Sequence, residues 1–169
     1  MRSYRRLTVI AVASAVACAF AASLASVVSA GLAVVKQRIA IVEEGNPDPD
    51  VNGLFFDLIP LTAGALTRDS GTVVESTGQF LDPVIRNGQQ VFPLVGTDTL
   101  SGKQGTFKIV IRVDSTDINS KYSVQVGTWS FKNGTGAYAG FTGGGRFAGV
   151  FLMQKNHAIS RLEGFISKR

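Results

Sequence analysis

The sequence predicts an all-β fold, an eight-stranded antiparallel β-barrel that follows an N-terminal signal segment. Three observations indicate this class. Short runs of alternating apolar and polar residues recur along residues 31–169, turn-forming residues separate them, and no stretch there shows a sustained 3.6-residue apolar stripe. Seven or eight short strands of this kind are typical of an antiparallel sandwich or barrel.

The first 30 residues have the composition of a secretory signal peptide. Arg2, Arg5 and Arg6 precede an almost wholly apolar run at 7–28, and small residues up to Ala30 offer a cleavage site. We therefore expect residues 1–30 to be a signal peptide and residues 31–169 to be a single domain. The mature chain would then be secreted or held in the cell envelope, without stable membrane insertion.

Two alternatives to simple cleavage stay open. The apolar run is long enough to span a bilayer, so an uncleaved signal would act as a membrane anchor. Residues 15–18, Ala-Val-Ala-Cys, resemble a lipoprotein-processing site, which would attach a lipid to Cys18.

Charge and cysteine content narrow the function classes. Cleavage after Ala30 would leave 14 basic and 12 acidic residues and a net charge of +2, and the basic residues are scattered. This is poor support for a nucleic-acid partner, and we expect none. Cys18 is the only cysteine, so the mature chain would have no thiol for a disulfide, a nucleophile or a metal site.

The first half of the mature chain predicts three strands. Residues 34–43 form the first, with Val35, Ile39 and Ile41 on one face. Residues 54–61 are apolar on both faces and read as a doubly covered strand or a short buried segment. Residues 69–71 predict a turn, 72–80 a weaker strand, and 82–93, with two prolines and Asn-Gly at 87–88, mostly loop.

The second half predicts the remaining strands. A short strand at 92–99 leads to a turn at 102–105, and 106–114 shows the cleanest alternation in the chain. Residues 114–120 read as a polar turn. In the next strand, 122–131, the apolar face changes near Gly127, which favours a bulge there. A final strand covers residues 158–167.

A glycine-dense turn between two strand-like arms, residues 127–153, organises the chain. Trp129 and Phe131 share one face of the first arm, and Phe147, Phe151 and Met153 share one face of the second. Between them, the sequence NGTGAYAG at 133–140 and three glycines at 143–145 allow sharp bends and close backbone approach. A strongly curved sheet needs such devices.

These residues carry a family resemblance. Residues 96–106 (GTDTLSGKQGT), the alternating strand after them, Gly-Thr-Trp at 127–129 and NGTGAYAG at 133–140 resemble a group of exported bacterial proteins of unassigned function. Their glycine-rich turn is similar to the one in dirigent proteins and allene oxide cyclases. The resemblance implies a closed eight-stranded antiparallel barrel, commonly trimeric, that holds a small apolar or phenolic ligand without a metal or organic cofactor.

Few residues stand out as a site. Trp129 and Tyr138 are candidates for a pocket mouth, and Arg146 after three glycines is a candidate anion contact, although core packing and an outward strand residue are the simpler accounts. His157 reads as an exposed turn residue. Residues 48–53, Asp-Pro-Asp-Val-Asn-Gly, match half of a calcium loop, but Ile59 stands where a carboxylate is needed. We expect no metal and no cofactor.

Two function classes follow. The first is a non-enzymatic exported protein that binds a small apolar ligand or has a structural role. The second is a cofactor-free cyclase, isomerase or dirigent-like enzyme that acts on a small apolar substrate. The lumen discriminates between them: a filled apolar lumen favours a structural role, whereas an open cavity with converging charged and hydroxyl groups favours catalysis.

Overall fold

The computed structural model describes residues 36–48 and 53–168, all of which belong to one compact unit within residues 34–169. The described residues are almost entirely β-strand, with two short 3₁₀ turns and no α-helix. The strands are β1 (Lys36–Asn46), β2 (Gly53–Pro60), β3 (Asp69–Phe80), β4 (Val84–Arg86), β5 (Gln89–Gly102), β6 (Gly105–Asn119), β7 (Tyr122–Lys132), β8 (Phe141–Leu152) and β9 (His157–Lys168). The 3₁₀ turns are η1 (Gly136–Tyr138) and η2 (Met153–Lys155).

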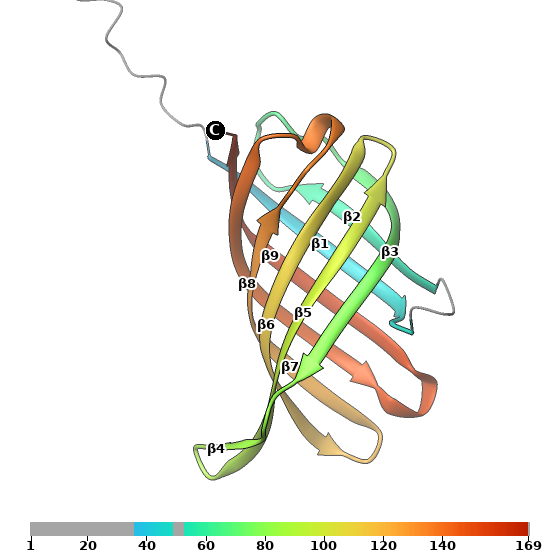
Figure 1. The fold of residues 1–169 in the computed structure, drawn as a ribbon, viewed down its shortest axis with the longest axis vertical. Coiled ribbons are helices and arrows are strands. Elements are labelled where there is room, and N and C mark those ends of the chain that lie inside the picture. The colour runs from blue at the N-terminus through green and yellow to red at the C-terminus, as the bar shows by residue number, and fades with distance from the viewer. Residues whose placement is uncertain (1–35, 49–52, 169) are drawn as a thin grey trace, which may run out of the picture. The chain divides into compact units, whose positions relative to one another are not determined.

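Eight of the strands form a closed ring of antiparallel pairings. The order is β3-β2-β1-β9-β8-β7-β6-β5, and β3 also pairs with β5, so each of these eight strands has two neighbours (Figure 1). β4 pairs only with β5 and projects beyond the ring as a small hairpin (Figure 1). The β2–β3 pairing is the shortest of the eight and involves only Asp69–Thr72 of β3, so the rest of β3 pairs on one side alone, with β5.

Alternation along the strands determines which side chains face the interior. On β6, Phe107, Ile109, Ile111 and Val113 are buried while their neighbours are less buried, as the sequence pattern predicts. A strand lies at each position where the sequence predicts one, at 36–43 of the predicted 34–43 and at 54–60, 72–80, 92–99, 106–114, 122–131 and 158–167. The prediction of an all-β antiparallel fold is confirmed.

Aromatic side chains fill one end of the ring. Phe107 stacks on Phe131 at 4.8 Å between ring centroids, packs against Tyr138 at 4.5 Å, and meets Phe56 edge-on at 5.6 Å. Tyr138 comes from η1, in the glycine-dense turn, and is fully buried. The turn that carries the family resemblance therefore supplies an aromatic plug for this end of the ring.

Asp69 fixes the same end by bonding to three segments. Its carboxylate accepts hydrogen bonds from the Tyr138 hydroxyl at 2.7 Å and from the backbone N–H groups of Ser70, Lys103 and Gln104. Burial raises the pKa of Asp69, but the four hydrogen bonds outweigh it and hold that pKa below its usual value. The start of β3, the β5–β6 turn and η1 are thereby tied to one anion.

Three local predictions are wrong. Residues 69–71 belong to β3 rather than to a turn, and β6 continues to Asn119 instead of ending in a polar turn at 114. Residues 82–93 are mostly strand, because Asn87 and Gly88 both have positive φ and close a two-residue hairpin between β4 and β5. The predicted turn there is correct, but the strands that it joins were missed.

The bulge expected near Gly127 is also absent. β7 pairs with β6 and β8 in unbroken register through Gly127, and the register shift of the β6–β7 pairing lies on β6, between Asp117 and Asn119. The apolar pattern changes because the inward residues change from apolar to polar: Trp129 and Phe131 face the filled end, whereas Ser123 and Gln125 lie toward the other end.

Candidate functional site

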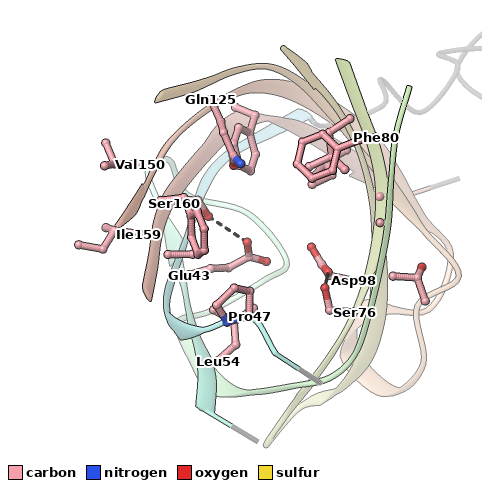
Figure 2. Close-up of a pocket in the computed structure, with 18 residues that line it drawn as sticks. Glu43, Pro47, Leu54, Ser76, Phe80, Asp98, Gln125, Val150, Ile159 and Ser160 are labelled. Carbon is pink, nitrogen blue, oxygen red and sulfur yellow. Dashed lines mark hydrogen bonds between the residues drawn. The ribbon is translucent and has the colours of Figure 1, made fainter. Parts of the chain in front are cut away.

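The other end of the ring interior holds a cavity of about 610 Å³. Its walls come from β1, β2, β3, β5, β6, β7, β8 and β9, so residues far apart in the sequence meet there (Figure 2). Apolar side chains such as Leu54, Phe80, Leu94, Ile111 and Phe147 make up most of the lining. A neighbouring hollow of about 320 Å³ shares Phe80, Gln125 and Phe151 with it.

Glu43 enters this cavity from β1. It follows Ile39 and Ile41 on the same face of the strand, and only 5% of its surface is exposed. Ser160 lies directly opposite on β9, and its Oγ donates a 2.9 Å hydrogen bond to Glu43 Oε2. This pairing fixes the carboxyl group at the wall (Figure 2).

Asp98 approaches from β5 in the same manner. It is 6% exposed, and Ser76 lies directly opposite on β3, where its Oγ donates a 2.5 Å hydrogen bond to Asp98 Oδ1. Figure 2 shows the side chains of Glu43 and Asp98 pointing toward one another across the cavity. Each carboxyl is thus held by a serine on the neighbouring strand, and the two meet in one space.

Burial raises the pKa values of both carboxyls. Loss of hydration, reinforced by the negative charge of Asp98, raises the pKa of Glu43 from 4.5 to about 8 despite the Ser160 hydrogen bond. Loss of hydration likewise raises the pKa of Asp98 from 3.8 to about 6, against the effect of Ser76. At neutral pH Glu43 therefore keeps its proton while Asp98 is mostly ionised.

One carboxyl oxygen of the pair is left without a partner. Glu43 Oε1 is buried and accepts or donates no hydrogen bond among the described residues. A buried polar atom without a partner costs about 1–3 kcal/mol. Lys, Arg and His are missing from the residues that line the cavity, so no cation compensates the two carboxyls there.

The residues predicted from the sequence as ligand contacts lie elsewhere. Trp129 is 3% exposed in the core, and its Nε1 donates to the backbone oxygen of Glu163 at 3.4 Å, while Tyr138 plugs the filled end. Arg146 is exposed on β8. Ligand binding by these three residues stays a prediction, and the cavity described above is lined by others.

The lone histidine lies within the described residues, whereas most of the calcium-like motif does not. His157 begins β9, and its Nε2 lies 3.5 Å from Oε1 of the exposed Glu44, outside the main cavity. Residues 49–52 of the calcium-like motif and the predicted signal peptide at 1–30 lie outside the described residues. Within residues 36–48 and 53–168, no group of three or more His, Cys, Asp or Glu could hold a metal ion.

Sequence reasoning missed both Glu43 and Asp98 as site residues. A signal for Glu43 was available, because it continues the buried face of Ile39 and Ile41 where a fourth apolar residue is expected. Asp98 gave a weaker signal, since it lies between threonines in a strand of mixed pattern.

Two further findings complete the description. In the part of the chain that the structure describes, no helix is long and apolar enough to cross a bilayer. Comparisons with protein families, with curated proteins and with solved structures found no match to this chain.

Proposed function

We propose that this chain is a dirigent- or allene oxide cyclase-like β-barrel that binds a small, mainly apolar ligand between Glu43 and Asp98. The ring of eight antiparallel strands supports the barrel type, together with the glycine-dense turn at 133–140. The cavity volume of about 610 Å³ falls within the range of about 300–1,000 Å³ that is typical of small-molecule sites.

The paired carboxyls support a catalytic role for the cavity in addition to ligand binding. Two buried acids whose pKa values lie near 8 and 6 provide a proton donor and a proton acceptor at the same pH. Such a pair supports general acid–base chemistry without a metal or an organic cofactor. A cofactor-free isomerase or cyclase is therefore the function that this cavity favours, ahead of a purely structural role.

A non-catalytic ligand-binding protein is the second candidate. The filled aromatic end around Phe107 supports it, because a packed plug of this kind serves stability alone. Both candidates require a ligand in the cavity, and they differ in whether Glu43 and Asp98 transfer a proton once the ligand is bound.

Binding of a neutral apolar dye tests the shared part of the proposal. N-phenylnaphthylamine, whose fluorescence increases in apolar surroundings, should bind the wild-type protein with saturation. Gly78→Leu should weaken this binding at least tenfold, because Gly78 lines the cavity and a Cβ there meets only the movable end of Leu94, at 3.3 Å.

Val126→Leu is the matched control for this experiment. It places an extra methylene on an exposed position of β7, 53% of which is open to solvent, and should leave dye binding unchanged. A wild-type protein that does not bind the dye, or equal binding by Gly78→Leu and wild type, would contradict the proposal.

Export and self-association accompany the proposed function. The composition of residues 1–30 supports export, which N-terminal sequencing of the mature protein would check. Exposed apolar side chains on the strands, such as Phe55, Val74 and Phe165, support a homo-oligomer, and sedimentation would show its size.

A further inference from the structure

The charge balance of the cavity restricts the ligand that it can hold. Among the described residues that line it, Glu43 and Asp98 are the only titratable ones, and none is a cation. A ligand carboxylate or phosphate would meet a negative charge at Asp98 without compensation. This inference rests on the proposed function, because it assumes that the cavity takes a ligand.

Glu43 offers a hydrogen-bond donor rather than an acceptor. Oε2 already accepts from Ser160, so the proton of the neutral carboxyl is available on Oε1, which has no partner. A ligand oxygen with a lone pair, such as a carbonyl oxygen, would satisfy it. An ammonium group would not, since it has no lone pair to accept the proton.

Asp98 offers the opposite function on the facing wall. Oδ1 accepts from Ser76, which orients the carboxylate toward Glu43 (Figure 2). In this arrangement Glu43 could donate a hydrogen bond to a ligand carbonyl oxygen. The Asp98 carboxylate, on the facing wall, could then remove a proton from the carbon next to that carbonyl.

We propose that the substrate is a neutral, mainly apolar ketone or aldehyde with a removable hydrogen next to its carbonyl group, and that the reaction is a proton transfer along it. Asp98 takes the proton from carbon, and the C–H electron pair forms the C=C bond of an enol. The carbonyl π electrons move to oxygen, which Glu43 Oε1–H stabilises or protonates. Asp98 then returns its proton to the same carbon, or to the far carbon of a conjugated C=C, and a proton taken up by the oxygen goes back to Glu43 Oε1 as the carbonyl re-forms. This completes exchange or isomerisation with no oxidant or reductant.

A set of matched probes tests the ligand class first. α-Tetralone, the hydrocarbon tetralin, and the corresponding amine and carboxylic acid share one ring system and differ in one polar group. In displacement of N-phenylnaphthylamine at pH 7, the ketone should bind about tenfold more tightly than tetralin, as expected for one added hydrogen bond in an apolar site. This preference should disappear in Glu43→Leu.

Hydrogen exchange tests the chemistry. In D₂O, NMR should show that the protein accelerates deuterium uptake at the carbon next to the carbonyl of α-tetralone. Asp98→Asn should lower this rate at least a hundredfold, and Glu43→Gln roughly a hundredfold. Glu75→Gln, on the exposed outer face of β3 beside Ser76, is the matched control and should retain the full rate.

The dependence of the exchange rate on pH distinguishes proton transfer by Glu43 and Asp98 from a purely structural role of these residues. The pKa values of about 6 for Asp98 and about 8 for Glu43 predict a bell-shaped rate with limbs near these two values, and Glu43→Gln should remove the alkaline limb. Tighter binding of the amine or the acid than of the ketone would overturn the inference, as would ketone binding without exchange. Failure of the dye to bind at all would instead overturn the proposed function itself.

Discussion

Replacement of Glu43 by glutamine should change how the stability of the protein depends on pH. In the folded chain Glu43 keeps its proton up to about pH 8, whereas in the unfolded chain it loses that proton near pH 4.5. Between these values the folded state binds one proton more than the unfolded state, so the free energy of unfolding falls as pH rises. The contribution is fully present below pH 4.5 and is lost by about pH 8.

The magnitude follows from the same two pKa values. Each pH unit between them costs about 1.4 kcal/mol, so ionisation of Glu43 withdraws at most about 5 kcal/mol in all. Asp98 adds a smaller loss, at most about 3 kcal/mol, between pH 3.8 and about pH 6. The interval from pH 6 to pH 8 therefore isolates Glu43, with an expected loss of at most about 3 kcal/mol in the wild type.

Urea unfolding at pH 6, 7 and 8 measures this loss. Trp129 is the only tryptophan and is buried, so its fluorescence reports unfolding directly. Glu43→Gln cannot ionise and should show a nearly flat stability over this interval, while Glu75→Gln, at an exposed position, should keep the wild-type slope. Equal slopes for Glu43→Gln and wild type would show that Glu43 does not hold the buried proton.

Two predictions concern the filled end of the ring. Tyr138→Phe removes the 2.7 Å hydrogen bond to Asp69 and should destabilise the protein by about 1–3 kcal/mol in urea unfolding; an unchanged midpoint would show that the backbone donors alone satisfy Asp69. Phe107→Ala removes the ring that contacts three other aromatic residues and should cost about 3–5 kcal/mol. Because Phe107 does not line the cavity, dye affinity of the folded variant should stay at the wild-type value; a large loss would show that the two ends of the ring are coupled.

The fold was more predictable from the sequence than the site. Alternation on strands such as β6 reports burial directly, because one face of each strand packs inside the ring. The glycine-dense turn predicted a strongly curved sheet, but its role in the core was not predicted. η1 directs Tyr138 into the core, where the Tyr138 hydroxyl bonds to Asp69, 69 residues earlier in the chain. No local pattern encodes a contact of that separation.

The strands beyond Phe80 show why local rules failed. Two prolines and Asn87-Gly88 are read from the sequence as signs of a loop. The same Asn-Gly pair also forms the turn of a two-residue hairpin, and here it joins the strands β4 and β5. Pro93 lies where the pairing of β3 with β5 ends: the Leu81 N–H donates to the Pro93 carbonyl oxygen at 2.8 Å, and the proline has no N–H to return a bond. Tertiary pairing, rather than propensity, decides this segment.

The apolar face changes along β7 because its inward residues pass from the packed core to the cavity, and no bulge is involved. Inside a closed ring, each inward position faces either packed side chains or the cavity, and polar inward residues are tolerated only where they reach a partner or a ligand. Ser115 and Ser123 continue the inward faces of β6 and β7 beyond their aromatic and aliphatic residues, and Gln125 lies beside them. A packing defect would be lined by apolar atoms alone. The inward acids Glu43 and Asp98, each opposite a serine, therefore differ from a packing defect, and their cost in stability fits the ligand site that we propose.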